Sequence, residues 1–150
     1  MKQTPESALS TWKSYLGLSE AEIRQRFPMD ECHVQRDGFY GNLKNLTVIY
    51  NPETCPGIFY LKNDTCLLFY RQADEDPDGM ALADITPLLG EPAADLTSRA
   101  GKQSTLYVYP AQGVALSTRD GAVEFLEIFA PLTLKDYLTR FYRKPGPFIR

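Results

Sequence analysis

The chain has 150 residues, of which 43% are hydrophobic and 23% are charged, and its formal net charge is −3 at pH 7. This length suits one domain, and these fractions are typical of a globular protein rather than a disordered or fibrous one. The negative charge argues against nucleic-acid binding through a generally basic surface, which requires Lys and Arg to neutralise phosphates.

The sequence also argues against a membrane protein. No apolar run approaches the roughly 20 residues that a spanning helix requires, and the N-terminus, MKQTPESALSTW, lacks the apolar core of a signal peptide. A cytoplasmic location is therefore predicted. Cys32, Cys55 and Cys66 are odd in number and lack metal-site spacing, so reduced thiols are expected.

Two helices are predicted before the first strands. Leu9, Trp12 and Leu16 follow helical spacing within residues 5–16. Ser19 precedes Glu22 by three residues, which is the spacing of a capping box at the start of a second helix. The following polar stretch, residues 34–45, offers only Phe39 and Tyr40 as possible strand residues.

Three strands are then predicted at residues 46–50, 57–61 and 65–71, with Asn63 and Asp64 as a tight hairpin turn. After the acidic segment 73–80 the pattern restarts with a short helix at residues 83–92 and a polar loop up to Ser104.

Three further strands are predicted at residues 105–109, 113–117 and 122–129, and Asp120-Gly121 provides the second hairpin turn. The third of these strands has no cleanly apolar face, which indicates either a wide central strand partly covered on both faces or a strand with an acidic contact surface. A C-terminal helix is expected at about 133–143, with Thr133 as its cap.

The predicted fold class is therefore α+β. We expect two copies of a helix followed by a three-stranded antiparallel meander, at about 18–72 and 81–130, sharing a sheet or core. Extra helices at about 5–16 and 133–143 complete a single domain.

A resemblance supports this interpretation. The helix end LLGEP at residues 88–92, the strand YVY at 107–109 and the hairpin before AVEFL at 122–126 resemble the helix-plus-strands unit of the small-protein-A family of outer-membrane assembly lipoproteins. A tandem of such units resembles the architecture of the β-lactamase inhibitor protein. The resemblance implies a binding role without catalysis, presented on a sheet face and loops.

Catalytic candidates are few. His33 is the sole histidine, so a cluster of several histidine ligands is excluded. A nucleophile pair of His33 with Cys55 or Cys66, brought together by folding, stays open. No enzymatic activity and no cofactor are predicted.

One stretch has calcium-loop character. Asp74, Asp76, Asp78 and Gly79 occupy the first, third, fifth and sixth positions of such a loop, but Ile85 stands where the final glutamate ligand belongs. A solvated linker is the expected structure, and the three aspartates remain weak metal candidates.

The predicted function is a non-catalytic protein-binding module, such as an immunity or inhibitor protein or an assembly adaptor, acting as a monomer or homodimer. Outward tyrosines on the strands are the main signal, since exposed tyrosines anchor protein interfaces. Basic residues after position 134 form either a solvated helix surface or a contact for an acidic partner. The candidate contact residues are Tyr60, Tyr107, Tyr109, Glu124, Arg143 and Phe148. The alternative is a small-ligand-binding protein, or an unrecognised enzyme, with a pocket between helices and sheet.

Overall fold

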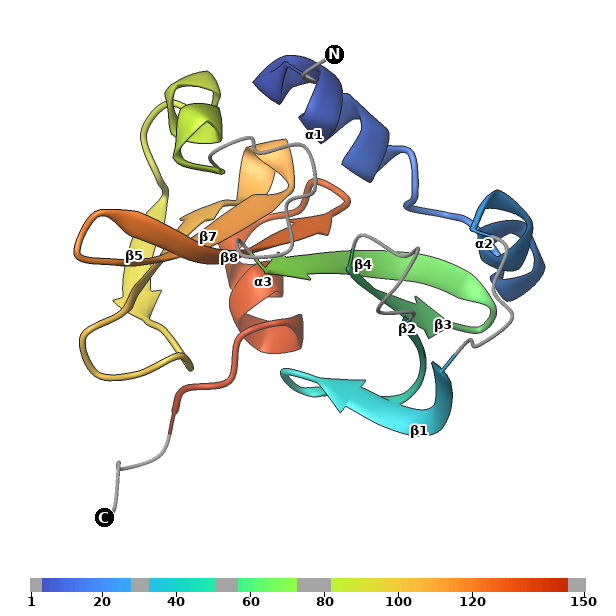
Figure 1. The fold of residues 1–150 in the computed structure, drawn as a ribbon. Helices are drawn as coiled ribbons and strands as arrows, with labels where there is room; N and C mark the ends of the chain where they lie inside the picture. Colours follow the sequence, from blue (N-terminus) through green and yellow to red (C-terminus); the bar gives the residue numbers. More distant parts are fainter. Residues whose placement is uncertain (1–3, 28–32, 51–56, 73–81, 146–150) are drawn as a thin grey trace.

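The computed structural model describes residues 4–27, 33–50, 57–72 and 82–145. The strands in these residues form one eight-stranded antiparallel sheet (Figure 1). The strand order is β1-β2-β3-β4-β8-β7-β6-β5, so two meanders meet at their last strands, β4 and β8. This central pairing runs from Leu68 opposite Phe129 to Gln72 opposite Phe125. The strands are β1 (His33–Tyr40), β2 (Leu43–Tyr50), β3 (Ile58–Lys62), β4 (Thr65–Gln72), β5 (Ala94–Thr97), β6 (Thr105–Tyr109), β7 (Val114–Arg119) and β8 (Ala122–Phe129).

The predicted fold class, two copies of a helix followed by a three-stranded meander, is wrong. Each half of the single sheet has four strands, because β1 and β5 occupy stretches that sequence patterns did not mark as strands. Both are edge strands, and five of the eight residues of β1 are exposed. Edge strands carry polar residues that discourage pairing with other chains, so they lack the apolar alternation used to recognise a strand.

The predicted helices are present but short. They are α1 (Pro5–Lys13), α2 (Glu20–Arg26) and α3 (Leu134–Arg140), while the helix expected before the second meander is the 3₁₀ helix η2 (Leu82–Leu88). A further 3₁₀ turn, η3 (Pro110–Gln112), joins β6 to β7. The capping box of Ser19 and Glu22 and the cap at Thr133 are both confirmed.

Both predicted hairpin turns are also confirmed. Asn63 and Asp64 have φ values of 51° and 59°, and Asp120 and Gly121 have values of 52° and 81°. Positive φ at both central residues matches the right-handed twist of the flanking strands, and Asn, Asp and Gly tolerate it best.

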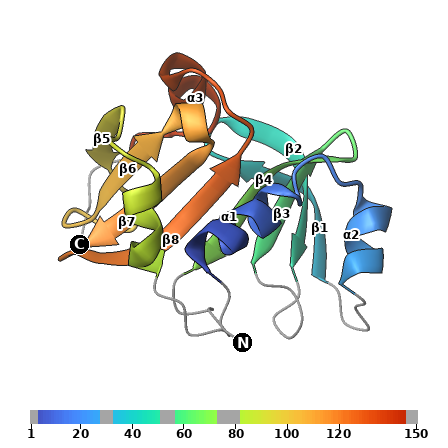
Figure 2. The same ribbon diagram turned by 90° about the horizontal axis from the view of Figure 1, so that it is seen from above.

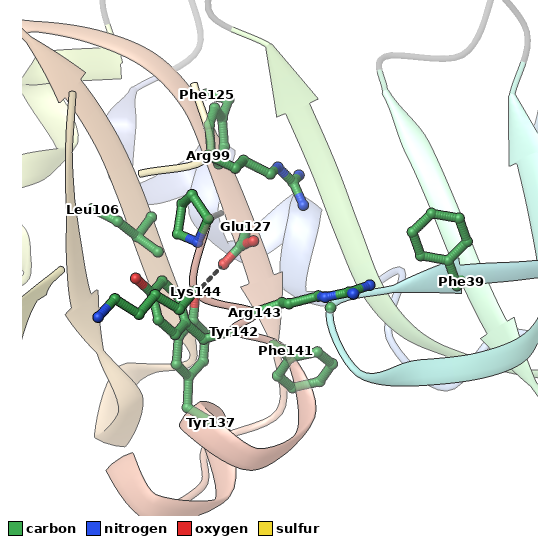
Figure 3. A pocket seen from close by; sticks show the side chains of 12 residues that line it. Phe39, Arg99, Leu106, Phe125, Glu127, Tyr137, Phe141, Tyr142, Arg143 and Lys144 are labelled. Atoms are coloured by element: carbon green, nitrogen blue, oxygen red, sulfur yellow. Dashed lines mark hydrogen bonds between the residues drawn. The ribbon is translucent and has the colours of Figure 1, made fainter. Parts of the chain in front are cut away.

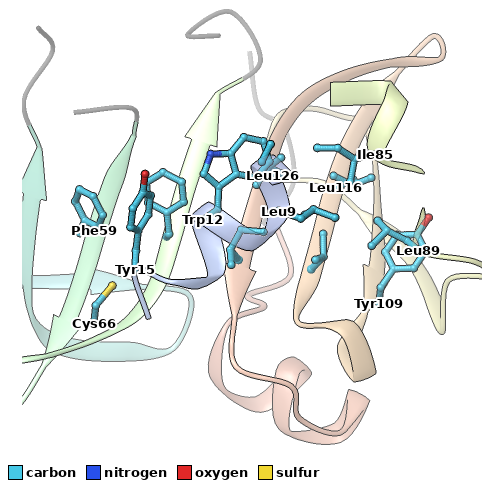
Figure 4. Close-up of a cluster of buried hydrophobic side chains, with 14 of the residues drawn as sticks. Leu9, Trp12, Tyr15, Phe59, Cys66, Ile85, Leu89, Tyr109, Leu116 and Leu126 are labelled. Carbon is cyan, nitrogen blue, oxygen red and sulfur yellow. The ribbon is translucent and has the colours of Figure 1, made fainter. Parts of the chain in front are cut away.

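Helices cover both faces of the sheet (Figures 1 and 2). One hydrophobic cluster packs beneath α1, α2 and η2 (Figure 4). In this cluster, the ring of Tyr15 lies 5.0 Å from that of Phe69. A second cluster packs against α3 through Tyr137 and Phe141. Strand β8 serves both clusters, with Leu126 and Ile128 in the first and Phe125 and Phe129 in the second. The interpretation of this strand as a central strand covered on both sides is therefore confirmed.

The turn between β1 and β2 rests on the C-terminal end of α3. The backbone N–H of Asn42 donates to the carbonyl of Arg140 at 3.0 Å. The side-chain amide of Asn42 donates to the carbonyls of Thr139 and Tyr142 at 3.0 and 3.1 Å. The last carbonyls of a helix have no partner within the helix, so these bonds fix the end of α3 against the hairpin.

Gly41 allows this close approach. Its φ is +56°, and a Cβ there would collide with the backbone carbonyl of Phe141. We expect Gly41→Ala to lower the free energy of unfolding by about 2–4 kcal/mol, because the substitution adds left-handed strain and separates the hairpin from α3. Urea denaturation measures this loss.

The matched control is Gly90→Ala. Gly90 also has a positive φ, +73°, but no atom lies within 4 Å of its added Cβ. It should lose only the strain, about 1–2 kcal/mol. Equal losses in the two variants would show that the contact with α3 contributes nothing.

Candidate functional site

A pocket of about 330 Å³ opens on the face of the sheet that α3 covers (Figure 3). Side chains of β6 and β8 form its floor, α3 and the segment after it form one wall, and the β1–β2 hairpin and the β5–β6 loop reach its rim. The lining residues are Phe39, Gly41, Arg99, Leu106, Phe125, Glu127, Tyr137, Phe141, Tyr142, Arg143, Lys144 and Pro145.

A buried carboxyl lies in this pocket. Glu127, on β8, is only 2% exposed, and each of its oxygens accepts a hydrogen bond from a phenol. Tyr137 of α3 donates to Oε1, and Tyr40 of β1 donates to Oε2. No Lys or Arg in the described part of the chain forms an ion pair with Glu127.

Burial changes the protonation of this group. Removal from water disfavours the charged carboxylate and raises the pKa of Glu127 to about 8, although the hydrogen bond from Tyr137 opposes the shift. Burial likewise raises the pKa of the Tyr137 phenol, which therefore stays neutral. Glu127 is mostly a neutral carboxylic acid at pH 7, and this form carries a proton that it can donate.

Arg99, in the β5–β6 loop, provides a fixed positive charge. Its guanidinium carbon lies 4.5, 5.1 and 5.3 Å from the ring centroids of Tyr40, Phe125 and Tyr70. One guanidinium nitrogen also donates to the Tyr40 hydroxyl at 2.9 Å. Cation–π attraction thus holds the charge at the pocket while leaving other N–H donors available.

The pocket is electropositive overall. Arg143 and Lys144, exposed residues after α3, add two cations to that of Arg99, and Glu127 is the one carboxyl among the described lining residues. A carboxyl with a near-neutral pKa could transfer protons in a reaction. The described lining residues contain no Ser, Thr, Cys or His.

The tyrosines predicted as contact residues do not share a surface. Tyr60 is half-buried on the α3 face, with its ring 4.7 Å from that of Tyr40. Tyr109 is buried in the cluster on the opposite face, and Tyr107 packs half-buried against that cluster. The sheet therefore separates Tyr60 from the other two.

Of the remaining predicted residues, Arg143 lines the pocket. Glu124 is half-buried and accepts a hydrogen bond from Ser117 at 3.3 Å. The residues that lie outside the described part of the chain are Cys32, Cys55, Asp74, Asp76, Asp78 and Phe148.

His33 and Cys66 do not line the pocket. His33 is exposed at the start of β1, with its ring 5.6 Å from that of Tyr50, whereas Cys66 is buried beneath α1 and α2. The described residues contain no group of three or more potential metal ligands. Their helices are all too short or too polar to cross a membrane.

The group formed by Tyr40, Arg99, Glu127 and Tyr137 was not predicted from the sequence. One signal was available, because Glu127 interrupts the apolar run of a strand expected to be covered on both faces. A charged residue in such a position is rarely buried without a partner, and buried carboxyls concentrate at functional sites.

Comparisons of the chain with protein-family models, curated proteins and solved structures give no match. The resemblance to the small-protein-A family and the β-lactamase inhibitor protein thus stays a prediction.

Glu127 makes stability depend on pH. Its folded pKa of about 8 lies above the ordinary 4.5, so the folded state holds an extra proton between these values and loses stability as pH rises. The loss approaches about 1.4 kcal/mol per pH unit. Glu127→Gln removes this pH dependence. Between pH 5.5 and 7.5, the free energy of unfolding of the variant should therefore rise relative to that of the wild type by about 1.4 kcal/mol per pH unit, as measured by urea denaturation.

Glu6→Gln, which removes an exposed carboxylate from α1, controls for the change in net charge. If the stability of Glu127→Gln ran parallel to that of the wild type across this range, the carboxyl would not be neutral in the folded protein.

Proposed function

We propose that the protein is a non-catalytic binding protein that takes a small organic anion into the pocket on the α3 face. The supporting observation is the placement of three cationic side chains around an aromatic pocket whose carboxyl is buried and hydrogen-bonded. With Glu127 neutral, Arg99, Arg143 and Lys144 leave a net positive charge that favours an anionic ligand.

The geometry of Arg99 favours affinity. Its guanidinium is already held against the rings of Tyr40, Phe125 and Tyr70, so anion binding costs little additional side-chain conformational entropy. One of its nitrogens bonds to Tyr40, and a planar guanidinium has further donors for an oxyanion. This side chain is the proposed primary anchor.

The walls favour an apolar body on the ligand. Leu106, Phe125, Phe141 and Pro145 present aromatic and aliphatic surface, whose burial would add to affinity at about 25 cal/mol per Å². The volume of about 330 Å³ lies at the lower end of the range for ligand pockets, roughly 300–1,000 Å³. A ligand with one or two fused rings suits this space.

Binding of naphthalene-2-sulfonate, followed by isothermal titration calorimetry, tests the proposal. We expect saturable binding of this anion and at least tenfold weaker binding of the neutral naphthalene-2-sulfonamide, which has the same ring system. Arg99→Met keeps an aliphatic stem over the rings but removes the charge. It should weaken binding of the sulfonate by about tenfold or more, because a hydrogen bond to a charged group contributes roughly 1.5–3 kcal/mol.

Lys13→Met is the matched control. It removes one positive charge from the exposed side of α1, across the sheet from the pocket, and should leave the affinity unchanged. Equal affinities for sulfonate and sulfonamide, or an Arg99→Met variant that binds like the wild type, would contradict the proposal.

A second candidate function is the binding of an acidic protein segment, which would fit the predicted role as an inhibitor, immunity protein or adaptor. The observation that favours it is Phe39, whose side chain is 67% exposed at the pocket rim. A second hollow adjoins the pocket and shares Phe39, Gly41 and Arg143 with it; Lys44 adds a cation there, and Asp37 adds a carboxylate. An exposed aromatic ring close to cations is a typical anchor for an acidic partner.

Selection of a displayed peptide library against the full chain tests this second function. We expect enrichment of acidic peptides that contain an apolar anchor, and loss of their binding in Phe39→Ser. The exposed position of Phe39 should keep the change in unfolding free energy within about 0.5 kcal/mol. Tyr50→Ser, at the opposite end of the β1–β2 hairpin, is the control. Peptides that bind Phe39→Ser as well as the wild type would rule out this surface.

A further inference from the structure

We propose that the pocket takes up a proton together with its ligand, that the ligand presents an oxyanion, and that Glu127 is the residue that carries the proton. This inference rests on the proposed anion-binding function and extends it to the chemical class of the ligand and to the pH at which binding occurs.

The Glu127 carboxyl is held by hydrogen bonds from two different elements. Two phenols, Tyr40 from β1 and Tyr137 from α3, donate to its two oxygens and fix its orientation at the pocket floor. Figure 3 shows Glu127 beside Tyr137 in the pocket. With both phenols acting as donors, the ionised carboxylate can only accept further hydrogen bonds. The neutral acid instead has one O–H group that it can donate.

The hydrogen-bonding character of the pocket therefore depends on one proton. When Glu127 is neutral, its hydroxyl joins the N–H donors of Arg99, Arg143 and Lys144. A site composed mainly of donors matches a ligand group that only accepts, such as a sulfonate, carboxylate or phosphate. A neutral amide or alcohol would leave donors unpaired, which disfavours its binding.

Electrostatics act in the same direction. An anion placed beside ionised Glu127 would put a second negative charge next to a buried carboxylate, which costs free energy. Protonation of Glu127 removes this repulsion, and burial already favours the neutral form in the free protein. An anionic ligand raises the proton affinity of the carboxyl further, so ligand and proton bind together.

Other groups around Glu127 do not replace it as the proton carrier. Burial raises the pKa of the Tyr60, Tyr137 and Tyr142 phenols, so they remain neutral where Glu127 titrates. Tyr70 lies directly opposite Glu127 on β4 and contributes a further phenol. The titratable and charged groups that face the carboxyl or the pocket are Tyr40 from β1, Tyr60 from β3, Tyr70 from β4, Arg99 from the β5–β6 loop, Tyr137 from α3, and Tyr142, Arg143 and Lys144 after α3.

The test measures binding of naphthalene-2-sulfonate to the full chain by calorimetry from pH 6 to 9, a range in which the sulfonate stays ionised. If only the neutral form of Glu127 binds, the dissociation constant should rise about tenfold between pH 7 and pH 9, in proportion to the loss of that form. Repeating the titration at pH 8 in buffers with different ionisation enthalpies should reveal proton uptake. Glu127→Gln keeps the size of the side chain and offers an N–H donor, so its affinity should be independent of pH, without proton uptake.

The outcomes separate this inference from the proposed function. Absence of sulfonate binding at every pH would overturn both. Binding with a flat pH profile in the wild type would overturn the proton coupling and leave the anion-binding function standing. A pH dependence that persisted in Glu127→Gln would assign the proton to another group and also overturn the inference.

A spectroscopic measurement keeps the test decisive if Glu127→Gln fails to fold. The ¹³C chemical shift of the Glu127 carboxyl in the wild type reports its titration directly. The midpoint should move to higher pH when naphthalene-2-sulfonate is added, and an unchanged midpoint would overturn the inference.

Discussion

The hydrogen-bonded burial of the Glu127 carboxyl joins parts of the chain that the sheet order keeps apart. Tyr40 reaches it from β1 and Tyr137 reaches it from α3, although β2, β3 and β4 lie between β1 and β8. A buried carboxyl without hydrogen bonds would be strongly destabilising, so the two phenols and the retained proton are what make the position tolerable. An apolar residue at position 127 would need neither hydrogen-bond partners nor a retained proton. The presence of a polar group where packing alone would favour an apolar one is the main reason to look for function at this point.

The pocket follows from the way in which the second face of the sheet is covered. Three helical elements, α1, α2 and η2, pack on the first face, whereas the second face has α3. With seven residues, α3 is only ~10 Å long at 1.5 Å per residue, so it cannot cover the wide sheet beneath it. The side chains of Leu106, Phe125 and Glu127 are left at the floor of a hollow beside its C-terminal end. The hairpin that caps this end through Asn42 brings Tyr40 to the same place.

Features that depend on neighbouring residues could be predicted from the sequence, and features that depend on distant ones could not. The capping box at Ser19, the cap at Thr133 and the turn at Asn63 and Asp64 involve residues a few positions apart, and all three occur. Strand β1 was missed because its polar residues suit a sheet edge rather than a core. The bond between Tyr40 and Glu127 spans 87 positions in the chain, and no local pattern encodes such a pairing. The tyrosines chosen from strand alternation lie on two faces of the sheet, with Tyr60 half-buried on the α3 face and Tyr107 and Tyr109 on the opposite face, an arrangement that alternation within single strands does not reveal.

The two candidate functions are not independent of each other. Phe39 and Tyr40 are neighbours on β1, where the pairing with β2 is irregular between Gly38 and Tyr40. Tyr40 is buried against Glu127 and Arg99, while Phe39 stands exposed at the rim. The bonds that fix Tyr40 therefore also fix the backbone that presents Phe39. A partner seated on Phe39 and Arg143 would cover the mouth of the pocket, since both residues line it. The same cations would bind a small anion and an acidic segment, so each ligand would reduce the affinity for the other. The exception is a partner whose own acidic side chain enters the pocket, because a single molecule would then occupy both sites.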